Sequence, residues 1–410
     1  MFGKIRISER IFWLGVNDRR KSLFENIHPL PQGVSYNSYL IADDRAALID
    51  TVDAGAGGGF AGLVGRRLEG RTLDYLVINH IEPDHSGKIA EIVAAYPDVK
   101  ILGNMQTRKI FEAYFGATEN FIDVSGGMTL DLGRYSLSFV MTPWVHWPET
   151  MMTYETTEKI LFSGDAFGTF GTLDGGIFDD EINFDFYEGE ALRYYANIVG
   201  KYSGMVQKAF AKLSGLDVRC VCPTHGPVWR KNPARIMSLY DKWSRYEAEE
   251  GVTVVFASMY GNAESVADYL ARRVAECGVR NIRVHDVSKT HLSFLVRDIW
   301  KYRGVMLGSC AYNSEMLPPM EQLCATLDHL GLRNRLLGLF GTFSWSGGGV
   351  KNLVRFAEKV GWEQVFAPIE FKGAPTDESC ARYDAGAAEF AARVLRGNSC
   401  AGSEEKGGAS

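Results

Sequence analysis

The stretch His80-Ile81-Glu82-Pro83-Asp84-His85 decides how this chain is interpreted. It follows the apolar run 75–78, which is typical of a short buried strand, so the polar residues begin where the backbone turns. Two imidazoles flank two carboxylates along it with little spacing. Side chains of these types at the end of a rigid strand are well suited to bind a metal ion.

Three later segments repeat this pattern of an apolar run followed by a ligand-type residue. The runs 137–141, 160–164 and 218–224 precede His146, Asp165 and His225. Each residue alone could be an ordinary polar residue of the core or the surface. Because all of them follow strand-like segments, we expect four strand ends to converge on one site with enough ligands for two metals.

In this order the ligands resemble those of the metallo-β-lactamase fold, an αββα sandwich with a two-metal site. Hydrolases of that fold usually carry H-x-H-x-D-H, whereas this chain has Glu82 at the position of their second histidine. A carboxylate adds negative charge and a harder oxygen ligand, which shifts the preference from zinc toward iron or manganese. The pattern H-x-E-x-D-H resembles that of the flavodiiron proteins.

This resemblance implies a role for each ligand. One iron would be held by His80, Glu82 and His146, the other by Asp84, His85 and His225, with Asp165 as the bridge. For residues that line the pocket and tune proton supply or sterics, we name His28, Tyr194 and Tyr195. A surface or structural role for His28 and a packing role for the two tyrosines are the alternatives.

Length and composition indicate two domains. A chain of 410 residues with 46% hydrophobic content exceeds the size of most single domains. A net charge of −6 without a basic stripe argues against nucleic-acid binding. No run is long enough to span a membrane, and the N-terminal segment lacks the apolar core of a signal peptide. Seven scattered cysteines also fit a reducing compartment, so we expect a cytoplasmic protein without a membrane partner.

The sequence places the domain boundary near residue 250. An amphipathic helix is predicted over 236–250, and an apolar strand over 252–257 follows Gly251. We therefore assign 1–250 to the metal domain, 251–396 to a second domain and 397–410 to a disordered tail that is rich in Gly, Ser and Glu.

The second domain repeats the order of strand, polar glycine-containing loop and helix. Backbone N–H groups at a helix N-terminus favour a phosphate, although a single such loop is a weak signal. Two later loops strengthen it, and parallel α/β sheets bind ligands beyond the carboxyl ends of their strands. The pattern resembles flavodoxin, a doubly wound parallel sheet that binds FMN. The implied FMN-binding residues are Ser258, Met259, Tyr260, Gly261, Asn262, Ala263, Ser309, Cys310, Ala311, Tyr312, Asn313, Ser344, Trp345, Ser346, Gly347 and Gly348.

Two features of these loops need comment. The flavodoxin phosphate loop typically reads S-M-Y-G-N-T-E, and this chain has Ala263 in place of the threonine. Losing one hydroxyl contact weakens phosphate binding by about 0.5 to 1.5 kcal/mol without removing the site. Tyr312 and Trp345 would lie against or beside the flavin ring, with ordinary packing as the alternative.

A flavin and two irons on one chain imply an oxidoreductase that passes electrons from FMN to the irons and on to a gas. Flavodiiron proteins reduce O2 to water, NO to N2O, or both, and a reduced carrier such as rubredoxin supplies the electrons. The chain has no paired C-x-x-C motifs, so we expect the carrier to be a separate protein. The family also implies a head-to-tail homodimer, or a dimer of such dimers, in which the flavin of one chain lies beside the irons of the other.

Two other classes of function remain open. The metallo-β-lactamase scaffold commonly supports metal-dependent hydrolysis, against which Glu82 and the flavin domain both argue. The other class is non-catalytic, a flavin electron carrier or a gas sensor, against which the complete ligand set argues. The sequence leaves open the choice between O2 and NO, the identity of the donor and the metal that is bound.

Overall fold

In the computed structural model, which describes residues 5–125 and 127–396, the chain divides into two units between Arg245 and Tyr246. Helix α7 (Pro233–Ser244) ends just before this point and strand β16 (Glu249–Ala257) follows it. The predicted helix over 236–250 is therefore wrong at its end. Tyr246 has a φ of 58°, and this left-handed conformation turns the chain away from the helix. The predicted tail, 397–410, lies outside the described residues.

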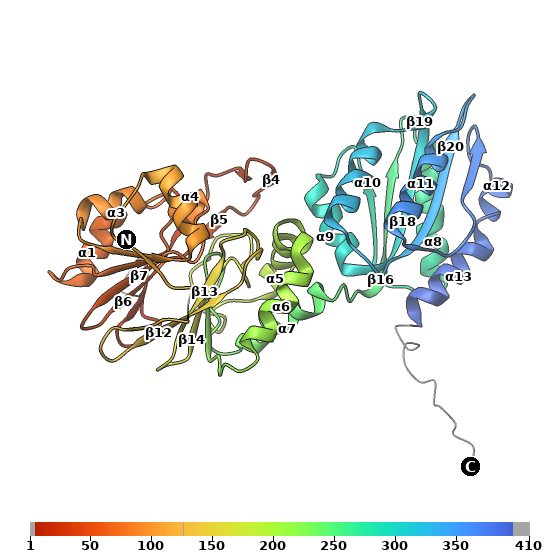
Figure 1. Cartoon of the computed structure of the whole chain (residues 1–410). Helices are drawn as coiled ribbons and strands as arrows, with labels where there is room; N and C mark the ends of the chain where they lie inside the picture. Colours follow the sequence, from red (N-terminus) through yellow and green to blue (C-terminus); the bar gives the residue numbers. More distant parts are fainter. Residues whose placement is uncertain (1–4, 126, 397–410) are drawn as a thin grey trace, which may run out of the picture. The chain divides into compact units, whose positions relative to one another are not determined.

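The first unit contains two main sheets with helices beside each (Figure 1). It also has two short strand pairs, β2 (Val16–Asp18) with β5 (Val34–Tyr36) and β3 (Leu23–Phe24) with β4 (His28–Pro29). In spatial order, the first sheet consists of β1 (Ile11–Trp13), β6 (Tyr39–Ala42), β7 (Ala46–Ile49), β8 (Tyr75–Val77), β9 (Lys100–Gly103) and β10 (Phe121–Asp123). The second consists of β11 (Thr129–Asp131), β12 (Ser136–Met141), β13 (Met151–Glu155), β14 (Ile160–Gly164) and β15 (Cys220–Pro223).

Burial along these strands explains the layered arrangement. Strands β6, β7 and β14 are buried along their whole length, as expected for sheets covered on both faces. In β12, Leu137 and Phe139 point inward while Ser136 and Ser138, which alternate with them, are half-buried, as in a strand with one covered face. The predicted αββα sandwich is confirmed.

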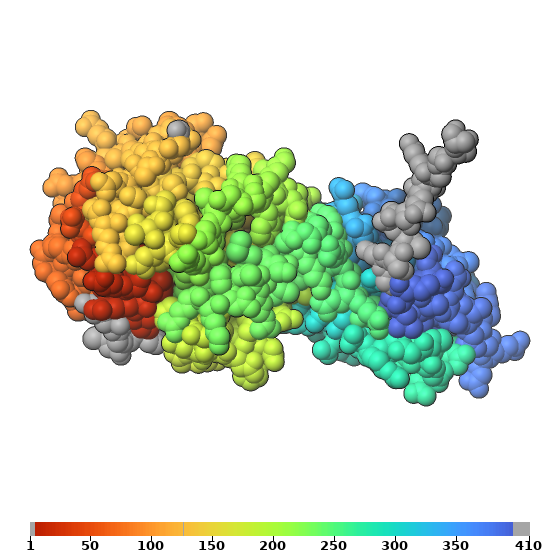
Figure 2. All heavy atoms as spheres, turned by 90° about the horizontal axis from the view of Figure 1, so that it is seen from below, coloured from red at the N-terminus to blue at the C-terminus, as the bar shows by residue number. Residues whose placement is uncertain are grey.

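Helices flank each sheet of the first unit. Beside the first sheet lie α1 (Phe60–Leu68), α3 (Ile89–Ala95) and α4 (Met105–Phe115), and beside the second lie α5 (Asp185–Tyr194), α6 (Ser203–Leu213) and α7. The segment with α6 and α7, green in Figure 2, forms part of the surface of this unit. At the start of α4, the side chain of Asn104 accepts hydrogen bonds from the N–H groups of Gln106 and Thr107, as an N-cap does.

The second unit is a parallel sheet with the strand order of flavodoxin. Its parallel strands are β17 (Ile282–Asp286), β16, β18 (Tyr302–Tyr312), β20 (Leu336–Phe343), β21 (Glu363–Gln364) and β22 (Ile369–Lys372), and the short β19 (Glu315–Met316) pairs antiparallel with the end of β18. Counted within this unit they follow the spatial order 2-1-3-4-5, with β21 and β22 both paired to β20 in the last place. The helices are α8 (Asn262–Glu276), α9 (Leu292–Lys301), α10 (Pro318–Leu330), α11 (Gly349–Val360), α12 (Asp377–Ala381) and α13 (Asp384–Leu395). The predicted doubly wound sheet is confirmed.

Among the described residues, no helix has both the length and the apolar character needed to cross a membrane.

Gly87 offers a test of how the fold holds the polar stretch at residues 80–85. It ends the short helix α2 (Pro83–Ser86), and a Cβ there would lie 2.3 Å from the backbone nitrogen of Ala54. We expect Gly87→Ala to lower the free energy of unfolding by about 1–3 kcal/mol, because backbone atoms must move to relieve the overlap. Urea denaturation followed by circular dichroism measures the change.

The matched control is Gly204→Ala in α6, where an added Cβ meets nothing within 4 Å. Alanine is the better helix former, so this control should leave stability unchanged or raise it by up to about 1 kcal/mol. Equal stability of the Gly87 and Gly204 variants would show that the approach of Ala54 is not tight.

Candidate metal centre and cofactor loops

All seven predicted metal ligands converge in the first unit, in two groups. One group is His80, Glu82, His146 and Asp165, and the other is Asp84, His85 and His225. Within each group the potential ligand atoms lie within 4.8 Å of one another. Every one of these side chains is buried. Such a concentration of ionisable groups is costly away from water unless the charges are paired or bind metal ions.

The ligands come from the ends of strands and from one short helix, as the sequence predicts. His80 follows β8, and Asp84 and His85 lie in α2, whose N-cap is Glu82. The backbone N–H and the hydroxyl of Thr51 both donate to the carbonyl of His85, at 2.8 and 2.7 Å. The other three ligands follow the strands of the second sheet: His146 follows β12, Asp165 follows β14 and His225 follows β15. The site therefore lies where the ends of the two sheets meet.

Asp165 lies between the two groups with one carboxylate oxygen toward each. Its Oδ2 is 3.1 Å from His146 Nε2 and 3.4 Å from His80 Nε2. Its Oδ1 is 2.8 Å from His85 Nε2 and 3.5 Å from His225 Nε2. The hydroxyl of Thr224 donates to Oδ1 at 2.7 Å and holds the carboxylate in this orientation. This is the placement that a bridging ligand requires.

Several ligand atoms have no hydrogen-bond partner in the described structure, which supports a metal site. They are both carboxylate oxygens of Asp84 and the Nε2 atoms of His85 and His225. His225 Nε2 and Asp84 Oδ2 approach to 3.3 Å without forming a hydrogen bond. Buried polar atoms are normally bonded, so atoms that face one another unbonded are explained by a cation between them. Imidazole and carboxylate ligands together suit iron or manganese.

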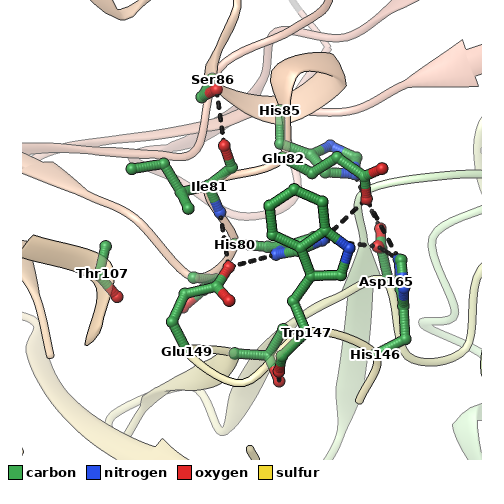
Figure 3. Close-up of polar contacts among 12 residues, drawn as sticks. His80, Ile81, Glu82, His85, Ser86, Thr107, His146, Trp147, Glu149 and Asp165 are labelled. Carbon is green, nitrogen blue, oxygen red and sulfur yellow. Dashed lines mark hydrogen bonds and ion pairs between the residues drawn. The ribbon is translucent and has the colours of Figure 1, made fainter. Parts of the chain in front are cut away.

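Residues around the ligands orient their side chains, and the sequence analysis missed them. Glu149 Oε1 is 2.7 Å from His80 Nδ1 (Figure 3), and the backbone carbonyl of Ser35 is 2.8 Å from His225 Nδ1. Asp50 accepts a hydrogen bond from the backbone N–H of Asn79 at 2.8 Å. No spacing or motif marks these residues, because their roles depend on contacts between segments distant in sequence.

A small cleft reaches the metal ligands from the surface of the first unit. It has a volume of about 190 Å³ and is lined by Lys21, Phe24, Glu25, Asp53, Glu82, Pro83 and Asp84. One ligand of each metal group therefore faces the cleft. Lys21 and Asp53 form an ion pair at 2.6 Å. Burial and the nearby charge of Glu82 raise the pKa of Glu25 to about 7.

The three predicted pocket residues lie in different surroundings. Tyr194 is fully buried with its ring 5.5 Å from that of His225, and its hydroxyl has no hydrogen-bond partner among the described residues. Tyr195 instead packs against Tyr240, and its hydroxyl is 2.9 Å from that of Ser203. His28 is half-buried, with Nε2 3.9 Å from the carboxylate of Glu25. The structure thus brings Tyr194 to the ligands and places Tyr195 in a separate aromatic cluster. His28 lies beside Glu25, which lines the cleft together with the ligands Glu82 and Asp84.

In the second unit, the three predicted loops leave the same edge of the sheet. Strands β16, β18 and β20 are parallel neighbours, with Ala257 opposite Ser309 and Ser309 opposite Gly341. The first loop ends at Gly261, whose φ of 92° favours glycine, and α8 begins at the next residue. The hydroxyl of Ser258 accepts the N–H of Gly261 at 3.0 Å. This loop and helix N-terminus have the form of a phosphate cradle.

Side chains of the three loops differ in exposure. Tyr260 and Trp345 are 91% and 78% exposed, and Met259 and Tyr312 are also exposed. Large aromatic side chains are rarely left this open unless a ligand or partner covers them.

Other predicted loop residues are buried beneath this edge. Ala263 and Ser309 are fully buried, and the Ser309 hydroxyl accepts the N–H of Leu317 at 3.1 Å, so it is engaged within the protein. A Cβ at Gly348 would lie 2.0 Å from the carbonyl of Ser314, so this glycine allows the second and third loops to meet. The remaining predicted residues of the second and third loops are Cys310, Ala311, Asn313, Ser344, Ser346 and Gly347, which follow or end β18 and β20.

Comparison with known families and proteins agrees with both units. Residues 34–226 match the family described as ODP family beta lactamase, and residues 254–386 match the flavodoxin family. The chain is 34% identical over 365 residues to the anaerobic nitric oxide reductase flavorubredoxin of Escherichia coli K12, a match that covers 88% of this chain and 76% of that one.

Two solved structures are similar over nearly the full length. The rubredoxin oxygen:oxidoreductase of Desulfovibrio gigas is 27% identical with a TM-score of 0.92, covering 97% of this chain and 100% of that one. The flavodiiron protein of Giardia intestinalis is 25% identical with a TM-score of 0.88, covering 97% and 98%.

Replacing the bridging carboxylate tests the geometry of the centre. We expect Asp165→Ala to lower the metal affinity of both groups, by more than the roughly 10–100-fold that loss of an outer partner costs, because each group loses a direct ligand. Elemental analysis of the purified protein measures the metal content. Asp131→Ala, which removes an exposed carboxylate on β11, is the control. Full metal content in the Asp165 variant would exclude the bridge.

Metal binding should depend on pH, because protons compete for the ligand nitrogens. Burial disfavours charge on His85 and His146, but the neighbouring carboxylates outweigh it and raise the pKa of each to about 9 in the metal-free chain. A metal binds only neutral imidazole, so binding near pH 7 must release protons and the apparent affinity must fall as the pH decreases below about 9. Calorimetry in two buffers with different ionisation enthalpies counts the released protons. Binding that releases none would contradict this expectation.

Proposed function

The chain belongs to the flavodiiron proteins, a family of oxidoreductases, and from this premise we propose that it reduces O2, NO or both at two irons held by the seven converging ligands. Electrons would reach the irons through FMN on the second unit. FMN and a diiron centre are the predicted cofactors, and membership of the family confirms them.

The observation that carries this proposal is the donor set around Asp165. Each metal position has two imidazoles and one carboxylate of its own, and Asp165 presents one oxygen to each. Glu82 replaces the histidine that the hydrolases of this fold carry at the same place. A carboxylate in that position favours a redox metal such as iron over zinc.

Residues of the chain perform three tasks at this site. The seven ligands hold the metal pair, and their supports fix the ring orientations. Burial keeps bulk water from most of the ligand atoms. The cleft beside Lys21 and Glu25 gives a small molecule access to both metal positions. Bound iron would supply the redox chemistry on the gas, and bound FMN would pass electrons to the iron.

Both reactions consume protons, so the site needs groups that deliver them. Reduction of O2 to water takes four electrons and four protons, and joining two NO molecules into N2O and water takes two of each. Glu25 lies in the cleft and His28 lies beside Glu25. We therefore assign His28 and Glu25 to proton supply, and Tyr194 to the shape of the pocket beside His225.

The electron donor and the assembly are further parts of the proposal. A reduced carrier such as rubredoxin, present as a separate protein, would reduce the FMN in the cytoplasm. A head-to-tail homodimer would place the FMN of one copy beside the irons of the other. The exposed aromatic residues Tyr260 and Trp345 on the flavin unit, and Phe186 on the metal unit, support a partner on each.

The alternatives differ from this proposal in an observable way. A hydrolase of the metallo-β-lactamase type would contain zinc and would not need the flavin unit. A flavin carrier or gas sensor would bind both cofactors and consume no gas.

The deciding experiment is metal and flavin analysis of the anaerobically purified chain, followed by O2 and NO consumption with chemically reduced rubredoxin. We expect two irons and one FMN per chain, with rapid consumption of at least one gas. The Asp165→Ala variant should retain FMN and lose gas consumption, since the two cofactors bind to different units. Zinc without gas consumption would support the hydrolase, and full cofactor content without turnover would support the carrier or sensor.

A further inference from the structure

Glu149 is a buried carboxylate that the metal centre does not use as a ligand. It lies in the loop between β12 and β13, three positions after His146, and its exposed fraction is 0%. A carboxylate placed this deep requires strong partners to offset its loss of hydration. Its Oε1 has two such partners, the ring Nδ1 of His80 at 2.7 Å and the backbone N–H of Ile81 at 3.1 Å (Figure 3).

This contact determines which nitrogen of His80 is free for a metal. An ionised carboxylate only accepts hydrogen bonds, so the proton of the neutral ring lies on Nδ1. The lone pair is then on Nε2, which is 3.1 Å from Glu82 Oε2 and 3.4 Å from Asp165 Oδ2. A carboxylate behind a ligand histidine fixes the orientation of the ring and raises its basicity as a ligand.

Glu149 is itself held in place from the other side. The side chain of Asn104 donates to the backbone carbonyl of Glu149 at 2.6 Å, while its Oδ1 caps α4. Helix α4 therefore anchors the backbone of Glu149 through Asn104. A rigid support of this kind fixes the position of the His80 ring relative to the rest of the fold.

Among the described residues, no carboxylate is hydrogen-bonded to a ring nitrogen behind the histidines of the other metal position; the buried Asp50 acts on His85 through its charge, without a hydrogen bond to the ring. Nδ1 of His225 faces the neutral backbone carbonyl of Ser35 at 2.8 Å, and Nδ1 of His85 has no hydrogen-bond partner in the described part of the chain. The direct ligands do not differ in kind, since each position has two imidazoles, one carboxylate and a share of Asp165. The hydrogen bond that a ligand ring donates to the charged Glu149 is thus a difference between two positions that have the same kinds of direct ligand.

We propose that Glu149 is the positioning residue that makes the two metal positions unequal, so that the position of His80, Glu82 and His146 binds its metal more tightly and fills first. This inference rests on the metal centre in the proposed function and is independent of the gas that is reduced. The carboxylate acts through His80 and does not touch the metal.

The test is a titration of the metal-free full-length chain with Co²⁺, whose absorption spectrum reports binding without any enzymatic turnover. The wild-type chain should bind two ions in separate steps. Glu149→Gln retains a hydrogen-bond acceptor of the same shape but lacks the charge. It should weaken the first step by roughly 10–100-fold and leave the second unchanged, so that the steps merge.

Single-position backgrounds show which metal is affected. In His225→Ala, which retains the His80 position, adding Glu149→Gln should lower the Co²⁺ affinity by roughly the same 10–100-fold. In His146→Ala, which retains the other position, the same addition should change nothing. Equal weakening in both backgrounds, or no weakening in either, would overturn the proposal.

A second buried carboxylate serves as the matched control. Asp50 is also buried and accepts hydrogen bonds from the backbone N–H groups of Asn79 and His80; its charge acts on His85 and His80, without a hydrogen bond to either ring among the described contacts. Asp50→Asn should leave the separation of the two steps intact, and merging of the steps in this variant would show that any nearby negative charge suffices. Circular dichroism of every variant verifies folding.

These outcomes are distinguishable from failure of the proposed function. Two unequal steps that Glu149→Gln merges would support the inference even in a chain that reduces neither gas. Gas reduction with two equal and independent metal sites would overturn the inference and leave the function standing.

Discussion

The structure of the first unit depends on one constraint, the burial of seven ionisable side chains at a single place. Carboxylates and imidazoles lose hydration there, and the cost is offset only where opposite charges, hydrogen bonds or metal ions replace water. Strand ends and the short helix α2 supply positions rigid enough for this replacement. Asp165 is the centre of the arrangement, because its two oxygens face the two ligand groups.

Charge balance explains why carboxylates are prominent at this site. Two divalent ions against Glu82, Asp84 and Asp165 leave one positive charge, which the ionised Glu149 cancels. A nearly neutral centre can remain buried while the charge on its metals changes during a redox cycle. Exchange of a histidine for Glu82 also separates this donor set from that of the zinc hydrolases with the same fold. Fold and function therefore diverge at individual ligand positions.

The second unit solves a different problem, the binding of a flat, phosphorylated cofactor by backbone and aromatic groups. Parallel pairing of β16, β18 and β20 brings their three loops to one edge of the sheet. Glycine at positions 261 and 348 allows backbone geometry that other residues would not tolerate. The open aromatic side chains of Tyr260 and Trp345 lie in these loops and provide surface for a ring system or a partner.

The sequence by itself determined where the seven ligands and the three loops of the flavin unit lie, and the resemblance that these motifs carry predicted the two folds. The positions were predictable because each is local: an apolar run predicts a strand, and a polar residue directly after it lies at the strand's end. The helical pattern of the sequence predicted that α7 continues to residue 250. The helix ends at Ser244 instead, and the left-handed conformation of Tyr246 turns the chain away from it.

Only the tertiary structure decided which residues surround the ligands. Glu149 contacts His80 and the carbonyl of Ser35 contacts His225, although the two residues of each pair are far apart in the sequence. Glu25 lines the cleft, although no motif marks it. The tertiary structure also decided that Tyr194 lies against His225 while Tyr195 packs against Tyr240, since the face of the helical segment that meets the ligands depends on how the segment packs. Contacts of this kind depend on how the two sheets pack, and side-chain patterns along one segment carry no information about them.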